Sequence, residues 1–323
     1  MDRHIRLVAV FILATLVSIG CARADDWPSR PVKLIVLSGP GGAPDIMARL
    51  ITEQVSRKFG KNFYVENSVG AGGITGMRAL KVSAADGYTF ALAPASSIVI
   101  APRVFKEVPF DIDADFAPVA FVGASPIAIA VKSDSPYKSF ADLLAALKAT
   151  PQSMSVATTL TNSLPHLLGV LTKLKVGADF TIVPFSSSPQ GVTALLRGDV
   201  VAMMDGYPSF EGMRQDGQVR ILASFDPARS DLTRGAPVVT EQIPGVVATG
   251  WFAIFAPRDT PQPIIDKFKS GVDEALGKPE VIEKMLTMTV APKPMPASEF
   301  ARFLATEKSF WNEAIDKSGA RAN

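Results

Sequence analysis

Short apolar runs alternate with segments of helical periodicity along most of the chain. The clearest case joins the β-branched, apolar run 34–37 to a segment in which Met47, Ile51, Val55 and Phe59 recur every four residues. The run predicts a buried strand, and the four-residue spacing predicts a helix with one apolar face. Because this alternation continues almost throughout, we expect an α/β fold built from βα units on mainly parallel sheets.

A loop of serine, glycine and proline joins this strand to this helix. Pro44 stands where a first helical residue would, a position at which its missing N–H costs nothing. The pair Gly41-Gly42 leaves the backbone uncovered and allows a positive φ. A helix N-terminus preceded by such a loop presents free N–H groups, which favours an anion. An ordinary βα turn is the alternative.

The same design recurs twice. A strand predicted over 153–157 precedes the polar loop 158–163 and a helix that begins near Pro165, and a strand over 180–185 precedes Ser186-Ser187-Ser188 and Pro189. Each helix start adds N–H donors without intrahelical acceptors. These loops contain no Lys or Arg, so neutral donors and helix dipoles would have to hold any anion.

Other polar residues at predicted strand ends have two interpretations each. Ser96 and Ser97 follow the strand that begins near Thr89, and they either face a cleft or cap the next helix. Asp205 ends an apolar strand and either projects into the same cleft or is a solvated or capping aspartate. His166 lies in the first turn of its helix and is either a ligand contact or a structural histidine.

Two long apolar segments, 118–131 and 246–257, predict a pair of crossover strands between two domains. We expect domain 1 to comprise 25–122 plus 252–323, domain 2 to be the insertion 123–251, and the ligand cleft to lie between them. The C-terminal part predicts structural helices that open at Thr260-Pro261, at Pro279 and near 298, with Met285 and Met288 as core residues.

The N-terminus predicts a signal peptide over 1–24. Arg3 and Arg6 precede an apolar core over 7–19, and Ala22-Arg23-Ala24 forms a small-x-small cleavage site. Cys21 suggests lipoprotein processing as a weaker alternative, since Ser18 stands where that signal usually has an aliphatic residue. We therefore expect export to the periplasm with cleavage after Ala24.

Removal of 1–24 changes the chemistry that remains. The full chain has 33 basic and 31 acidic residues, and the signal takes three basic residues and one acidic residue, which leaves 30 of each. It also takes the only cysteine, so a thiol nucleophile, a disulfide and a thiolate metal site are excluded. A mature chain with no net charge and no run of basic residues lacks the positively charged surface that binds nucleic acid or an anionic membrane.

Catalytic and cofactor motifs are also missing. The glycines after Asn67 fail the dinucleotide pattern, because the third glycine of G-x-G-x-x-G falls on Thr75, and no phosphate-loop Lys-Ser/Thr follows. No Gly-x-Ser-x-Gly elbow supports a triad. His166 is the only histidine after residue 24, and scattered carboxylates offer no metal-ligand spacing. We expect no cofactor and no metal.

The order of motifs along nearly the whole mature chain resembles the Bug or TctC-like solute receptors of tripartite tricarboxylate transport systems. The motifs are Trp27-Pro28-Ser29-Arg30-Pro31, Pro40-Gly41-Gly42 with Asp45, Glu66-Asn67 with Gly70-Ala71-Gly72-Gly73, Asp86-Gly87-Tyr88-Thr89, Asp115-Phe116-Ala117-Pro118-Val119, Pro165-His166-Leu167, Val183-Pro184-Phe185, Met204-Asp205 with Pro208, and Gly250-Trp251 with Ala256-Pro257.

The resemblance implies a two-domain periplasmic-binding-protein fold of the Venus flytrap type (type II-like), which closes on a small carboxylate. With the strand-end candidates above, the ligand-binding set is Ser38, Gly41, Gly42, Asp45, Ser96, Thr158, Thr159, Asn162, Ser163, His166, Ser186, Ser187 and Asp205. Ser38-Gly39, Leu160 and Ser187-Ser188 depart from the family's usual loop lining, which leaves the ligand's identity open.

The expected function is capture of a mono-, di- or tricarboxylate, or alternatively an amino acid or aromatic acid, by a monomeric receptor that delivers it to inner-membrane permease subunits. One rival is an orphan receptor that signals to a membrane sensor. Another is a hydrolase on a similar two-domain frame, which would use His166 with a nearby Ser or Asp.

Overall fold

The computed structural model describes residues 27–159 and 161–318. Ten described strands form one connected sheet in the order β2-β1-β3-β9-β4-β7-β5-β6, with β8 and β10 also paired to β4. The strands are β1 (Val32–Val36), β2 (Phe63–Asn67), β3 (Thr89–Pro94), β4 (Phe116–Lys132), β5 (Ser155–Thr159), β6 (Thr181–Phe185), β7 (Ala202–Gly206), β8 (Val219–Ser224), β9 (Thr249–Pro257) and β10 (Ala291–Pro292).

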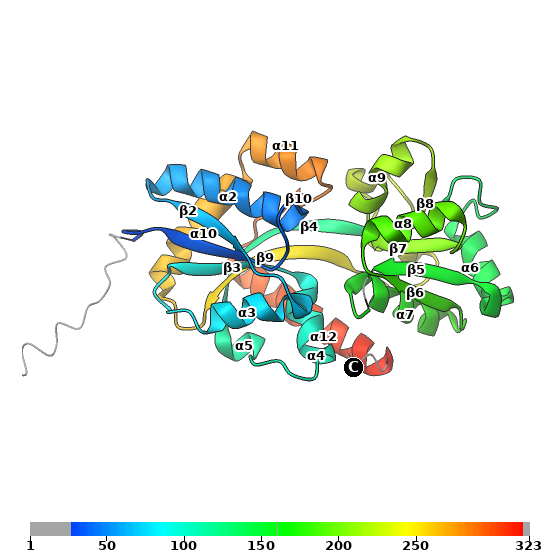
Figure 1. Cartoon of the computed structure of the whole chain (residues 1–323), viewed down its shortest axis with the longest axis horizontal. Helices are drawn as coiled ribbons and strands as arrows, with labels where there is room; N and C mark the ends of the chain where they lie inside the picture. The colour runs from blue at the N-terminus through cyan, green and yellow to red at the C-terminus, as the bar shows by residue number, and fades with distance from the viewer. Residues whose placement is uncertain (1–26, 160, 319–323) are drawn as a thin grey trace, which may run out of the picture.

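The helices flank this sheet in two groups (Figure 1). They are α2 (Ala43–Phe59), α3 (Ile74–Lys81), α4 (Ala101–Val104), α5 (Ile112–Asp115), α6 (Phe140–Ala149), α7 (Leu164–Val176), α8 (Ser188–Arg197), α9 (Pro208–Gln215), α10 (Gln262–Leu276), α11 (Pro279–Thr287) and α12 (Ala297–Ser318). Short turns of helix are η2 (Ala71–Gly73), η3 (Ser96–Ile100), η4 (Pro151–Ser153), η5 (Asp231–Thr233) and η6 (Val239–Glu241).

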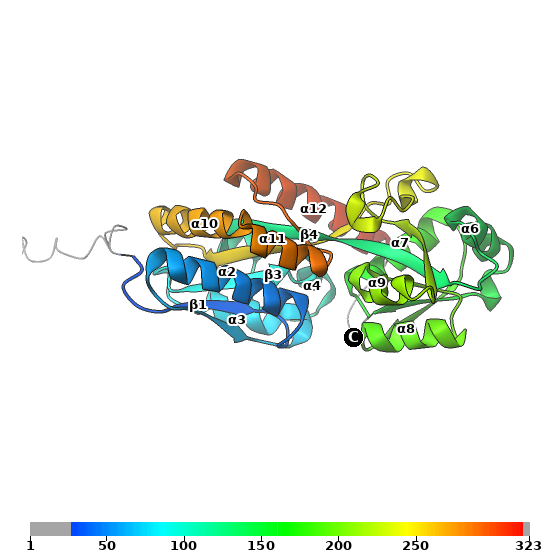
Figure 2. The same ribbon diagram turned by 90° about the horizontal axis from the view of Figure 1, so that it is seen from above.

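The unbroken strand β4 connects two lobes, as Figures 1 and 2 show. Its first part, up to Pro126, pairs with β9, and its second part, from Ile127, pairs with β7 and β8. We call the part around β1, β2, β3 and β9 lobe 1, and the part around β5, β6, β7 and β8 lobe 2. The predicted long segment 118–131 is thus one strand, whereas the domain limits given above stay a prediction.

The expectation of mainly parallel sheets is wrong. Among the nine strand pairs of the described chain, β1–β2, β1–β3, β5–β6 and β5–β7 are parallel and the other five are antiparallel. The parallel pairs are those of the βα units in each lobe. The antiparallel pairs all involve β4 or β9, which run in opposite directions between the lobes.

Strand register makes the carboxyl ends of the parallel strands in each lobe face the other lobe. In lobe 1, Pro94 at the end of β3 pairs with Phe252, near the start of β9, and β1 runs parallel to β3. In lobe 2, Gly206 at the end of β7 pairs with Ile127, where β4 leaves β9, and β5 and β6 run parallel to β7. Loops after β1, β3, β5, β6 and β7 therefore meet at the gap between the lobes, the edge at which open α/β sheets bind ligands.

Helix α12 packs on both lobes. Phe300, Leu304 and Ile315 are buried in one core cluster with Phe121 of β4 and Leu168 of α7. A second cluster lies under α2 and α10 and contains the buried ring of Phe268. No helix of the described residues has both the length and the apolarity needed to cross a bilayer.

Local predictions of helix starts are confirmed. Prolines occupy the first turn of α2, α7, α8 and α11, and α10 begins one residue after Pro261. Met285 is fully buried and Met288 packs against the same core cluster, as expected of core residues. The strand predicted over 153–157 begins two residues later, as β5 (Ser155–Thr159). The reason is that the helical turn η4, which starts at Pro151, still includes Ser153. The predicted signal peptide lies outside the described residues.

Asp226 is a buried carboxylate beside the start of β9. Its Oδ1 accepts a hydrogen bond from Thr249 Oγ1 at 3.4 Å, and its Oδ2 has no partner in the described chain. Burial raises the pKa of Asp226 to about 6. The folded protein therefore binds more protons than the unfolded chain between about pH 4 and 6, and stability must fall as the pH rises through that window.

We expect Asp226→Asn to remove this loss of stability with rising pH. Near pH 3 the variant should match the wild type, and at pH 7.5 it should be more stable by up to about 3 kcal/mol, at 1.36 kcal/mol per pKa unit. Urea unfolding at several pH values measures the difference. If the free energies of unfolding of the variant and the wild type differ by the same amount at pH 4.5 and at pH 7.5, the raised pKa of Asp226 is contradicted.

Candidate functional site

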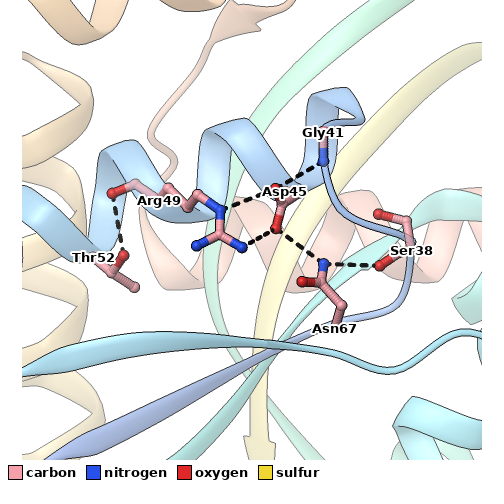
Figure 3. Close-up of polar contacts among 6 residues, drawn as sticks. All are labelled: Ser38, Gly41, Asp45, Arg49, Thr52 and Asn67. Atoms are coloured by element: carbon pink, nitrogen blue, oxygen red, sulfur yellow. Dashed lines mark hydrogen bonds and ion pairs between the residues drawn. The ribbon is translucent and has the colours of Figure 1, made fainter.

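The loop between β1 and α2 is organised by the carboxylate of Asp45 (Figure 3). Asp45 Oδ2 accepts hydrogen bonds from Gly41 N–H and Arg49 Nε, both at 3.0 Å. Its Oδ1 accepts from Arg49 Nη2 at 2.9 Å and from Asn67 Nδ2 at 3.0 Å. Asn67 Nδ2 also donates to the carbonyl oxygen of Ser38 at 2.9 Å. The network therefore ties both ends of the loop to the first turn of α2.

The electrostatics of Asp45 follow from these partners. Its side chain is 4% exposed, whereas that of Arg49 is 56% exposed. The guanidinium of Arg49 is the largest cause that lowers the pKa of Asp45 to about 2, and burial opposes it. Asp45 is thus a charged, fully partnered group, and Arg49 neutralises the negative charge that it would otherwise present to a ligand.

The two glycines of this loop differ. Gly41 has φ +80°, in the left-handed region, and its N–H is taken by Asp45. Gly42 is the N-cap of α2 with φ −77°, and no side chain caps the helix there. The expected positive φ therefore belongs to Gly41 only, and the N–H groups of Gly42, Ala43 and Asp45 have no acceptor in the part of the chain that the structure describes.

The N-terminus of α7 is capped by its own serine. Ser163 Oγ accepts from His166 N–H at 3.3 Å and donates to the carbonyl oxygen of Thr159. Asn162 has φ +62°, and its N–H donates to His166 Nδ1 at 3.2 Å. Burial lowers the pKa of His166 below its usual value. Since Nδ1 accepts, we assign the neutral tautomer with its proton on Nε2.

The N-terminus of α8 differs from that of α7. Ser187 is the N-cap in extended conformation, but its side chain makes no capping hydrogen bond. Ser186 Oγ donates to Gln190 Oε1 at 2.6 Å, and Gly191 N–H donates to the carbonyl oxygen of Ser187. The N–H of Gln190 has no acceptor among the described residues. Helices α2 and α8 thus both begin with an uncapped first turn, at loops that face one another across the gap.

Three candidates lie at the ends of β5 and β7. Thr159 Oγ1 donates to Asp205 Oδ1 at 3.3 Å, and Asp205 Oδ2 is buried without a partner in the described chain. Thr158 points the other way, because it is fully buried and its methyl lies close to Gly169 of α7. Thr158 therefore packs inside lobe 2 with its Oγ1 buried and without a partner in the described chain, and its role as a ligand contact stays a prediction.

A cavity of about 210 Å³ lies between the lobes and brings together residues of β3, η3, β4, α7, β7 and β9 and of the loops beside them. Of the predicted site residues, Ser96 and Ser163 line it. The others that follow β1, β5 and β6 lie outside its lining, in loops or first helical turns; they are Ser38, Gly41, Gly42, Asp45, Asn162, His166, Ser186 and Ser187. The full lining is Pro94, Ala95, Ser96, Ser125, Pro126, Ile127, Ser163, Leu164, Pro165, Gly206, Gly250, Trp251 and Phe252.

Most of this lining could not be predicted from the sequence. Ser125, Pro126 and Ile127 lie inside the long strand β4, and only the pairing of β4 with β7 and β9 brings them beside the loops. The motifs Gly250-Trp251 and Pro165-His166-Leu167 were the sequence signals available for the rest of the lining. No cluster of three or more His, Cys, Asp or Glu side chains that could hold a metal occurs in residues 27–159 and 161–318.

The model of the tripartite tricarboxylate transporter family receptor, TctC, matches residues 47–320. The chain belongs to this family. TctC proteins are periplasmic receptors of transporters and thus binding proteins, not enzymes. Protein BugT of Bordetella pertussis (strain Tohama I) is 31% identical over 323 residues, which covers 99% of each chain.

Solved structures show the same α/β periplasmic-binding-protein fold. A structure described as a periplasmic transporter has a TM-score of 0.79 at 30% identity and covers 91% of this chain and 99% of its own. Rpa4515 of R. palustris, solved with adipate, has a TM-score of 0.80 at 27% identity and covers 92% and 99%. MatC of Rhodopseudomonas palustris, solved with malate, has a TM-score of 0.76 at 26% identity and covers 90% and 100%.

Proposed function

We propose that this TctC-family receptor binds a small organic carboxylate between its lobes and delivers it to inner-membrane permease subunits. The observation that carries the proposal is the pair of uncapped helix N-termini, α2 and α8, on loops of opposite lobes. Such N-termini favour anions through their free N–H groups and the helix dipole. The adipate and malate in the structures of Rpa4515 and MatC support the carboxylate class.

The proposed contacts come from both lobes. Lobe 1 contributes the N–H groups of Gly42 and Ala43, and lobe 2 contributes Ser187 Oγ and Gln190 N–H. Asp45 acts by holding the first loop in shape, not by touching the ligand. We propose domain limits of 25–122 plus 252–323 and 123–251, with the ligand favouring the closed arrangement because only that arrangement brings both sets of donors to it.

Neutral hydrogen-bond donors are sufficient to bind a carboxylate with micromolar affinity. A micromolar Kd corresponds to about −8 kcal/mol. Hydrogen bonds to a charged group contribute roughly 1.5–3 kcal/mol each, and a helix N-terminus adds about 0.3–1 kcal/mol, rising to ~2 kcal/mol when partly buried. Four or five such contacts reach that affinity after the costs of ordering.

A panel of acids tests the proposal. Thermal shift followed by calorimetry on mono-, di- and tricarboxylates, with matched amides and alcohols as controls, should find micromolar binding for at least one acid and none for its amide. Mass spectrometry of the molecules that co-purify with the protein guides the choice of acids in the panel. Tight binding of an uncharged amide with no binding of any acid would contradict the proposal.

Export is part of the proposal. The basic start, apolar core and Ala22-Arg23-Ala24 predict a mature chain that begins at Asp25 and contains no thiol. The intact mass of the protein recovered from the periplasm should equal that of residues 25–323. A mass that includes a diacylglyceryl group on Cys21 would place the protein on a membrane surface instead.

A further inference from the structure

The cavity between the lobes has an unusual composition for the site of a polyacid. None of its lining residues is Lys, Arg, His, Asp or Glu. Most of the wall comes from apolar side chains, above all those of Ala95, Ile127, Leu164, Trp251 and Phe252, the first four of which are also buried in the described chain. A second carboxylate placed there would lose its water without gaining a cationic partner, which is costly.

The polar groups at the cavity also disfavour a second anion. Ser163 Oγ is already used as donor to Thr159 and acceptor from His166. Asp205, which precedes the lining residue Gly206 in the sequence, has one buried oxygen without a partner in the described chain and brings no positive charge to this region. Ser96 and Ser125 are the remaining hydroxyls of the lining.

The position and size of the cavity favour one end of a bound acid. It is lined by Ser163, Leu164 and Pro165 at the start of α7, and it lies at the same edge of the sheet as the loops after β1 and β6, where we propose that the carboxylate binds. Its volume is about 210 Å³, and an apolar cavity of roughly 150 Å³ accepts benzene. A six-membered ring or an aliphatic chain of similar volume therefore fits.

We propose that this cavity is a subsite for the uncharged, apolar end of the ligand, so that the receptor selects an aromatic or short aliphatic monocarboxylate over di- and tricarboxylates. The inference rests on the proposed function, because the carboxylate of the ligand is held by the loops described above. The proposed preference for a monocarboxylate differs from the ligands present in the structures of Rpa4515 and MatC, since adipate and malate are both diacids.

Calorimetry with benzoate, cyclohexanecarboxylate and hexanoate, against succinate, adipate and citrate, tests the inference. At least one apolar monocarboxylate should bind tenfold or more tightly than every di- and tricarboxylate. If the polyacids bind and the apolar acids do not, the subsite is wrong while the proposed function stands. If no acid binds at all, the proposed function itself fails.

A charge placed in the cavity gives a second test. Ser96 is half-buried at the start of η3 and lines the cavity. Ser96→Lys should weaken the best apolar monocarboxylate at least tenfold and strengthen adipate, because the ammonium pairs with the distal carboxylate. Ser298→Lys, which adds the same charge at an exposed position of α12, serves as control and should change neither affinity. Unchanged monocarboxylate affinity in Ser96→Lys would overturn the subsite.

Discussion

Replacement of Ser187 by aspartate is expected to abolish carboxylate binding without loss of stability. An aspartate at this N-cap can accept from Gln190 N–H, which has no acceptor among the described residues, and aspartate is among the best N-cap residues. The new carboxylate then occupies the donors that the ligand would use and repels it, since like charges cost several kcal/mol. We expect affinity to fall at least 100-fold, about 2.7 kcal/mol.

Ser187→Asn is the matched control. Its amide oxygen also caps the helix but adds no charge, so the loss of affinity should be about tenfold or less. Calorimetry with the ligand found in the acid panel and thermal melts on both variants separate binding from stability. Normal affinity in Ser187→Asp would show that the N-terminus of α8 does not face the ligand.

Asp45→Ala should cost both stability and binding. The substitution leaves Gly41 N–H without its acceptor and Asn67 Nδ2 with only the carbonyl oxygen of Ser38, and it frees the loop from α2. Loss of hydrogen bonds to a charged, buried group predicts a destabilisation of about 2–4 kcal/mol, measured by urea unfolding. Affinity should fall at least tenfold, because the donors of Gly42 and Ala43 lose their fixed positions.

The partner in the ion pair provides the contrast. Arg49→Ala removes an exposed guanidinium and should cost clearly less stability than Asp45→Ala. The pH dependence has a definite sign: because the pKa of Asp45 is lowered to about 2, its stabilisation is complete above about pH 4 and is lost as the pH falls towards 2. Equal destabilisation by Asp45→Ala and Arg49→Ala would show that the ion pair, rather than the loop network, is what matters.

Local chemistry made much of the fold predictable. Proline fixes φ and is tolerated in a first helical turn, so Pro44, Pro165 and Pro189 marked three helix starts correctly. The membership of the family, predicted from the order of motifs, is confirmed. Each of these signals depends only on neighbours in the sequence or on motif order.

Features that depend on pairing between distant segments could not be predicted. The antiparallel partners of β4 and β9 come from segments up to about 170 residues apart, as in the pair Gly123–Pro292, and no periodicity encodes them. The same pairing creates the cavity, so Ile127 and Phe252 had no sequence signal as site residues. Asp45 was predicted as a site residue, but its hydrogen bonds to Arg49 and Asn67, which hold the loop, could not be predicted from the sequence.

The position of β9 in the sheet has a consequence for how the chain folds. β3 and β4 are neighbours along the chain, yet β9 lies between them in the sheet. Lobe 1 therefore cannot complete its sheet until residues 249–257 have been synthesised, and α12, which closes its core, comes last. Contacts of such large sequence separation slow folding. A nascent chain thus stays unfinished through most of its synthesis, a state that suits the export across a membrane that we propose for it.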